Sequence, residues 1–176
     1  MKVDNAISPR DGFRYQADIA WHTSISGSDR SFVKYGTDFT FYKSFGSKHK
    51  LTFASRIGAN FISGNYDFFF APTIGQGENI RGLFSERFRG DASFFHTTDI
   101  RKELGSSNNI ILPFSFGVIG SFDYGRVWLE GEDSGVLHRS YGGGFWIAPL
   151  NIAVLSFHFS RSDVDSRFMV RVGHAF

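Results

Sequence analysis

The sequence predicts an all-β protein, and more specifically a transmembrane antiparallel β-barrel with about eight strands per chain. Apolar and polar residues alternate along most of its 176 residues, which is the period of a strand with two different faces. The chain contains 22 Phe, 6 Tyr and 3 Trp, yet its mean hydropathy is only −0.16. No segment approaches the roughly 20 consecutive apolar residues that a membrane helix needs. The aromatic residues therefore indicate sheets with one apolar face.

The eight strands follow from the alternation, taken in chain order. Three precede a long interruption at about 63–90, and five follow it. Several reach the 9–11 residues that a tilted strand needs to cross a bilayer. Their alternating apolar residues begin with Phe13, Tyr15, Ala17, Ile19, Trp21 and Ile25; then Val33, Tyr35, Phe39, Phe41 and Phe45; then Leu51, Phe53, Ile57, Ala59 and Phe61; then Ala92, Phe94 and Ile100; then Leu112, Phe114, Phe116, Val118, Phe122 and Tyr124; then Tyr141, Phe145 and Ile147; then Leu155, Phe157 and Phe159; and finally Phe168, Val170, Val172 and Phe176.

Alternation alone does not separate a soluble sandwich from a membrane barrel. A sandwich turns its apolar face inward, whereas a membrane barrel turns it to lipid and lines its lumen with polar residues. Strand length and the abundance of Phe favour the barrel, with the lipid bilayer of a bacterial outer membrane as its partner. The whole chain, 1–176, is then a single transmembrane domain.

The connections differ in length. Residues 27–30, 46–48 and 162–166 are short polar turns, and residues 130–137 form an intermediate loop. The segment at about 63–90 is much longer, and a loop of that length in a compact domain is usually functional. Because it is aromatic, we expect it to pack against the rest of the protein.

Several function classes are disfavoured. The net charge of +2 is too balanced to suggest nucleic-acid binding. The chain has no cysteine, and its six histidines lack ligand spacing, so we expect neither a metal site nor a cofactor. Enzyme motifs are missing too, and no enzymatic activity is expected. The first twelve residues lack the apolar core of a signal peptide, which suggests a processed form behind a new Met or an excised piece.

Three features remain: Ile80-Arg81-Gly82-Leu83 in the long loop, Phe122-Asp123-Tyr124-Gly125 on the fifth strand, and a last strand that ends in Phe176. Considered singly, their ordinary interpretations are a solvated loop arginine, an aspartate in a polar lumen and an unremarkable strand.

Taken together and in this order, these features resemble the C-terminal half of the BamA/TamA superfamily of outer-membrane barrels, the bacterial surface antigen family. The resemblance covers nearly the whole chain. It rests on the Pro-x-x-Gly turn within 8–12, Arg81-Gly82 in the long loop, Thr98-Asp99-Ile100-Arg101, the run from Phe122 to Trp128, the run from Ser140 to Pro149, and the terminal Gly173-His174-Ala175-Phe176.

The resemblance implies a mechanism. The long loop would fold into the lumen, where Arg81 bonds to Asp123 with Asp99 beside it and Gly82 permits a tight turn. Insertion or translocation of unfolded outer-membrane proteins would be the function, although the chain lacks periplasmic substrate-binding modules. A passive pore or membrane anchor, possibly the barrel part of a larger protein, is the alternative. The terminal alternation would act as an insertion signal: Phe168, Val170, Val172, Gly173 and Phe176.

Geometry adds a difficulty. An eight-stranded barrel is just filled by its own side chains, so it has no room for a loop of about 28 residues. Open sheet edges are forbidden in lipid, where each unpaired backbone group costs several kcal/mol. Three solutions follow: a missing N-terminal half-barrel, a second copy that completes about sixteen strands, or closure of eight strands alone with the loop outside. The two-copy ring is our leading hypothesis.

Overall fold

The computed structural model describes residues 2–5, 7–25, 30–46, 50–75, 79–107, 113–131, 135–150 and 152–176. Within these residues the protein is built of antiparallel strands, as the sequence predicts, and its one helical element is the 3-10 turn η2 at Phe68–Phe70. None of the described helical segments could cross a membrane. The architecture is therefore all-β.

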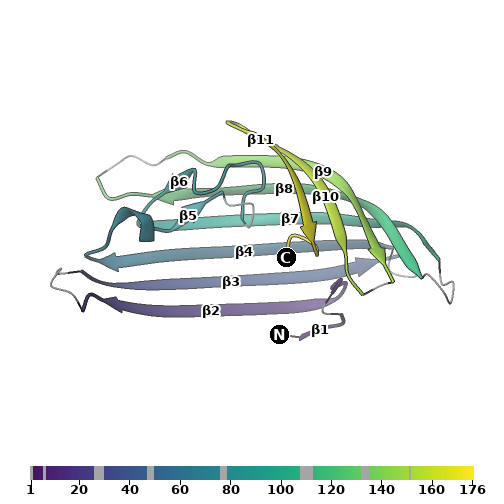
Figure 1. Cartoon of the computed structure of the whole chain (residues 1–176), viewed down its shortest axis with the longest axis horizontal. Coiled ribbons are helices and arrows are strands. Elements are labelled where there is room, and N and C mark those ends of the chain that lie inside the picture. Colours follow the sequence, from purple (N-terminus) through teal and green to yellow (C-terminus); the bar gives the residue numbers. More distant parts are fainter. Residues whose placement is uncertain are drawn as a thin grey trace.

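One curved sheet contains nine strands, and a separate pair lies against it (Figure 1). The neighbours in the large sheet follow the chain, so each connection is local except the long loop between the fourth and fifth of these strands. In order they are β1 (Lys2–Val3), β2 (Gly12–Thr23), β3 (Ser31–Phe45), β4 (Leu51–Gly64), β7 (Ala92–Ser107), β8 (Phe114–Trp128), β9 (His138–Pro149), β10 (Leu155–Ser162) and β11 (Ser166–Val172).

The eight expected strands correspond to β2, β3, β4 and β7–β11. The sequence missed β1, which is two residues long, and the pair β5 (Thr73–Ile74) and β6 (Phe88–Arg89) inside the long loop. Strands this short contain too few residues to show a recognisable alternation of apolar and polar side chains. The start of the fifth expected strand at Leu112, and most of the turns at 27–30 and 46–48, lie outside the described residues.

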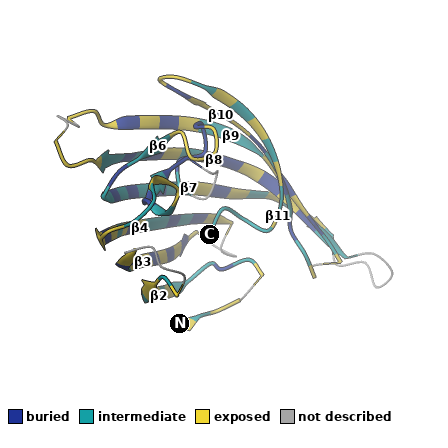
Figure 2. Cartoon of the chain, turned by 60° about the vertical axis from the view of Figure 1, so that its left-hand side comes forward, coloured by how far each residue is buried: buried dark blue, intermediate teal, exposed yellow. Residues whose placement is uncertain are grey.

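The polarity of the two faces of the sheet is the reverse of that in a soluble sandwich. Polar side chains on the inner, concave face are buried, and apolar side chains on the convex face are exposed. The strands in Figure 2 therefore show alternating bands of buried and exposed residues. The buried row includes Thr40, Thr52, Thr97, Asp99, Asp123, Ser140, Ser156 and Ser160, and the exposed row includes Tyr15, Trp21, Phe39, Ile57, Ile100, Phe116, Phe145, Phe159 and Val170.

Successive strands are staggered along the sheet. A row of directly paired residues can be followed across the sheet, one residue per strand. It starts at Gly12, the first residue of β2, and reaches Arg167, the second residue of β11. This row passes through Gly12, Tyr42, Ala54, Asp99, Ser121, Gly142, Ser160 and Arg167. Because β2 begins at the end of the sheet where β11 finishes, the strands are tilted, as a barrel wall requires.

The last three strands bend over the concave side (Figure 1), and glycines of β9 allow β10 to approach closely. A Cβ on Gly144 would lie 1.9 Å from the carbonyl oxygen of Phe157, whereas one on Gly143 would point away and meet only the carbonyl oxygen of Ile119, at 3.3 Å. A side chain at position 144 would therefore clash with backbone atoms, which cannot rotate out of the way.

Replacing Gly144 by Ala should separate β9 from β10 and lower the free energy of unfolding by about 1–3 kcal/mol, the usual cost of overpacking. Urea unfolding in detergent, followed by tryptophan fluorescence, measures the change. Gly143→Ala is the matched control and should cost clearly less. Equal effects at the two positions would contradict this packing.

The terminal strand is shorter than the sequence predicts. β11 ends at Val172, and Gly173 adopts a φ of +104°, a conformation that favours glycine. The remaining residues turn to the concave side, where the Phe176 ring lies 5.7 Å from the Arg101 guanidinium. Phe176 thus leaves the outward row that Phe168, Val170 and Val172 still occupy, contrary to the expected alternation through the last residue.

Candidate functional site

The loop between β4 and β7 lies on the concave side of the sheet (Figure 1). Three of its apolar residues, Ile74, Ile80 and Leu83, are fully buried and form a cluster that Phe88 and Val127 extend. Burying them favours a fixed loop position, since each removes apolar surface from water. The solution in which eight strands close around side chains alone, with the loop outside, does not fit this placement.

Arg81 is the residue by which the loop is bound to the sheet. Its Nε donates to one carboxylate oxygen of Asp123 at 2.9 Å, and its Nη2 donates to the other oxygen. The Arg81 backbone N–H donates to the same carboxylate at 3.0 Å. Nη1 donates to Asp99, and Nη2 also donates to the carbonyl of Thr98 at 3.1 Å. The structure therefore brings Arg81, Asp123 and Asp99 together.

A second arginine completes this cluster. Arg101, which is also buried, donates to the other oxygen of Asp99 at 3.1 Å and to the carbonyl of Phe176 at 3.2 Å. Two guanidinium groups thus face two carboxylates, and the buried charges cancel. The four side chains Arg81, Asp99, Arg101 and Asp123 are called the arginine–aspartate cluster below.

Charge balance matters because these groups are almost fully removed from solvent, with Arg81 only 3% exposed and Asp99 0% exposed. Burial by itself would lower the pKa of Arg81, but the carboxylates of Asp99 and Asp123 outweigh burial and raise that pKa. Arg81 therefore stays charged. Removing one member of a buried ion pair typically costs about 3–5 kcal/mol, because its partner is left charged and unpaired.

The residues beside Arg81 extend the attachment to the last three strands. Gly82 donates its N–H to the hydroxyl of Ser140 on β9 at 3.0 Å, and its carbonyl accepts from Ser162 on β10 at 3.2 Å. Arg167 on β11 donates to the carbonyl of Leu83 at 2.9 Å. With Asp99 on β7 and Asp123 on β8, one short loop motif contacts five consecutive strands.

Two glycines permit this close approach, though not in the way the sequence suggests. Gly82 does not have a positive φ. A Cβ there would lie 2.5 Å from the Ser140 hydroxyl, so the reason for glycine is lack of space and not a tight turn. Gly125 on β8 likewise leaves room for the loop, because its Cβ would lie 2.9 Å from the side chain of Ile80. Phe122, which precedes Asp123 on β8, points to the exposed convex face and so away from the loop motif.

The base of the loop has its own anchor. The Tyr66 hydroxyl donates to Asp91, whose other oxygen accepts the backbone N–H of Glu130. Burial, together with the bond to Asp91, raises the pKa of Tyr66 to about 12. The phenol therefore keeps its proton through the neutral pH range, and the loop is held at both its base and its tip.

The chain ends also meet on the concave side. His174 and Ser8 are joined by a hydrogen bond of 3.2 Å between the imidazole Nε2 and the hydroxyl. Arg10 forms an ion pair with Glu103 of β7 at 2.9 Å. The C-terminal residues and residues 8–10 therefore lie inside the curve at one end of the sheet. β1, at the N-terminal end, instead extends the sheet beside Gly12, whose φ is +128°.

Sequence patterns alone missed Arg101, Ser140, Ser162 and Arg167. Each lies on the inner row of its strand, and the only available signal was that a polar residue occupied every second position. Which of many such residues contacts the loop depends on strand register. Strand register sets which inner-row residues stand next to each other, and local sequence does not reveal it.

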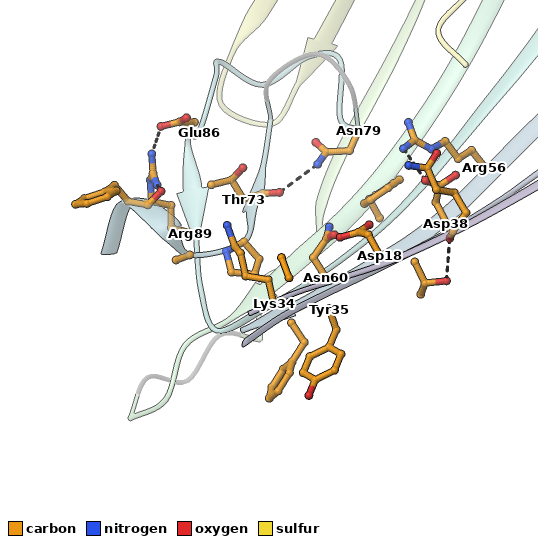
Figure 3. A pocket seen from close by; sticks show the side chains of 18 residues that line it. Asp18, Lys34, Tyr35, Asp38, Arg56, Asn60, Thr73, Asn79, Glu86 and Arg89 are labelled. Carbon is orange, nitrogen blue, oxygen red and sulfur yellow. Dashed lines mark hydrogen bonds and ion pairs between the residues drawn. The ribbon is translucent and has the colours of Figure 1, made fainter. Parts of the chain in front are cut away.

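A polar cavity of about 500 Å³ lies between part of the loop and the inner face of β2, β3 and β4 (Figure 3). Acidic and basic side chains both line it, among them Asp18, Lys34, Asp38 and Arg89. Arg56 of β4 and Asp38 of the adjacent β3 form an ion pair of 3.2 Å in its wall. Over the described part of the chain, no group of His, Asp and Glu side chains could hold a metal ion. The cavity is therefore a mixed-charge space suited to water and small polar solutes.

No family model matches the chain, and no curated protein matches it.

Replacing Arg81 by Ala should leave Asp123 and Asp99 short of one cation, destabilise the folded protein by about 3–5 kcal/mol and release the loop. Limited proteolysis within residues 65–91, alongside urea unfolding, would detect both effects. Arg89→Ala is the control, since Arg89 lies in the same loop but outside the cluster, where it pairs with the exposed Glu86 and donates to the carbonyls of Phe68 and Phe69. It should lower stability clearly less than Arg81→Ala, because it leaves no buried charge unpaired. If both variants behave alike, the cluster does not fix the loop.

Proposed function

We propose that this chain forms part of a transmembrane β-barrel of the bacterial outer membrane, of the type that inserts or translocates other outer-membrane proteins. The proposal includes membership in the BamA/TamA superfamily, as the equivalent of its last eight strands. The observation that carries it is the reversal of the sheet's faces. Ionised groups are buried on the concave side, and aromatic and aliphatic side chains are exposed on the convex side.

A bilayer accounts for this reversal. In water, a convex surface with so many exposed aromatic and aliphatic side chains would be an extended apolar patch of the kind that monomeric soluble proteins avoid. In lipid the same surface is favourable, and the concave side becomes a polar lumen. β3, β4, β7 and β8 contain 14–16 residues each, which exceeds the 9–11 that a tilted crossing needs.

The insertion type is supported by the short strands at one end of the sheet. β10 and β11 have only 8 and 7 residues, and the chain leaves β11 at Gly173. A closing joint formed by so short a strand would have few hydrogen bonds and would separate at low cost. Meanwhile the loop, bound by Arg81, keeps β7–β11 together as one body. Such a barrel could open at its joint without losing the rest of its structure.

The test is reconstitution in lipid vesicles with a second, urea-unfolded outer-membrane barrel as client. An insertion protein should raise the client's folding rate severalfold above that in empty vesicles, measured by resistance to protease. Arg81→Ala should reduce this effect, and Arg89→Ala should not. A client that folds equally fast with and without the protein would contradict insertion activity.

A passive pore is the second candidate, and the polar cavity beside the loop favours it. Ion conductance across the same vesicles, without faster client folding, would support the pore over insertion. Neither effect in a protein that is stably embedded would favour a membrane anchor.

Membrane embedding itself can be tested at Ile57, which lies mid-strand on the convex face and is 44% exposed. In lipid, Ile57→Arg should destabilise the fold by about 2–4 kcal/mol, the cost of a cation near the bilayer midplane. In water the same exposed substitution would be almost neutral. Urea unfolding in vesicles measures the difference, with Ile57→Leu as the control. A negligible effect of Arg would argue against a lipid-facing surface.

A further inference from the structure

The large sheet has two free edges. β2 pairs with β3 on one side, and on the other side β1 covers only Gly12 and Phe13. The outer edge of β11, from Ser166 to Val172, pairs with no described residue. Inside a bilayer each unpaired backbone group costs several kcal/mol. Both edges therefore need a strand.

We infer that a second copy of this chain supplies it: β11 of each copy pairs with β2 of the other, which gives a two-fold ring of sixteen long strands. The inference rests on the proposed transmembrane function. Eight long strands alternate in direction, so β2 and β11 run antiparallel to each other. Two copies can therefore close head to tail with antiparallel pairing at both joints.

Closure by one chain is disfavoured by what lies inside the sheet. The interior of an eight-stranded barrel is just filled by side chains from its own strands. Here the concave side also holds the loop, whose residues Arg81, Gly82 and Leu83 together contact five strands, and a cavity of about 500 Å³ beside it. Sixteen strands enclose a lumen wide enough for two such loops.

The structure also limits the register of the joint. Outward residues are odd-numbered on β2 and even-numbered on β11, so each inner residue must face an inner residue. β1 already occupies the edge at Gly12 and Phe13, so the partner's β11 must pair further along. The register that sets the partner's Val172 opposite Ala17 brings its Ser166 opposite Thr23, the last residue of β2.

Strand tilt favours the same register. In this register, the row of paired residues that runs from Gly12 to Arg167 continues at His22 of the next copy. The row has then shifted about ten residues along β2. After a full turn of the two-copy ring the total shift is about twenty residues. With a rise of about 3.3 Å per residue and about 4.8 Å between strands, sixteen strands then tilt by about 41°, within the usual range of about 35–45°. Pairing Val172 with Phe13 would give about 27°, which is too shallow for a barrel of this kind.

Charge and shape complement each other in this register. Asp18, on the inner row of β2, is exposed; it attracts Lys34 on the neighbouring β3 but forms no hydrogen bond or ion pair with any described residue. It would face the partner's Arg171, which lies on the inner row of β11. On the outer face, Ile19 would face the partner's Val170, and Trp21 would face the partner's Phe168. Opposite charges and aromatic or β-branched pairs are the combinations that stabilise antiparallel neighbours.

The second copy would also complete the cavity in Figure 3, whose lining includes Asp18 and Gln16 from β2. As β2 is the edge of the sheet, the wall beyond it is open in one chain. The partner's Met169 and Arg171 would form that wall. The lumenal space beside the loop is thus shared between the copies.

Engineered disulfides test this directly, because the chain has no cysteine of its own. Two differently tagged copies, one Ala17→Cys and the other Val172→Cys, are coexpressed, and membranes are oxidised with copper phenanthroline. Paired residues on neighbouring strands lie within the Cα separation that a disulfide allows. We expect a covalent dimer carrying both tags, and the same from Ile19→Cys with Val170→Cys. Ala17→Cys with Phe168→Cys should give at least several-fold less.

A dimer equally abundant for all three combinations would overturn the register, and no dimer from any of them would overturn the pairing of two copies. The double variant Ala17→Cys/Val172→Cys in one chain tests self-closure: a faster-migrating monomer without dimer would overturn the inference. Alkaline extraction of the same membranes keeps the two proposals apart. Protein that resists extraction without cross-linking refutes only the second copy, whereas protein that is fully extracted refutes the transmembrane function.

The predicted ion pair gives a second readout. Asp18→Arg should lower the yield of the Ile19–Val170 cross-link several-fold, because two arginines would then be opposed. Adding Arg171→Asp should restore it. If neither substitution changes the yield of this cross-link, Asp18 does not pair with the partner's Arg171.

Discussion

The arrangement of the last five long strands depends on one buried ion cluster. Arg81 brings a full positive charge into a space where solvent hardly reaches, and this is possible only because Asp123 and Asp99 meet it there. Arg101 balances the second carboxylate and extends the contact to Phe176. Buried charges tolerate little displacement, so the cluster holds the loop and β7–β11 in one relative position.

That constraint divides the sheet into two parts with different roles. From β7 to β11, every strand contacts the loop motif. β2, β3 and β4 face part of the loop across a polar cavity, and Phe70 of the loop packs directly on Phe32 of β3, with 4.8 Å between ring centroids. The first part is therefore bound to the loop motif by hydrogen bonds and ion pairs. The second part meets the loop through aromatic packing and is joined to the first by the β4–β7 ladder. A sheet built this way can keep its loop fixed while its free edges remain available to pair with other strands.

The free edges and the exposed apolar face of the sheet have one common explanation. A sheet with buried polar residues and exposed aromatic ones has little reason to be stable in water, but it suits a wall between lipid and a wet lumen. A wall must also close, and here stagger, strand length and the position of β1 restrict closure to very few registers. Proposed function and proposed partner therefore follow from the same geometry, although separate measurements test them.

By itself, the sequence determined the all-β class, the eight long strands and the place of the long loop, because period-two alternation is a local signal that needs no knowledge of the fold. Tertiary structure decided which face is buried, since alternation reads the same in a sandwich and in a barrel wall. It also decided that Arg101, Ser140, Ser162 and Arg167 contact the loop, which depends on register between strands distant in sequence. Even Phe176, apparently one more member of an outward row, was redirected by a single positive φ at Gly173 and a cation on β7.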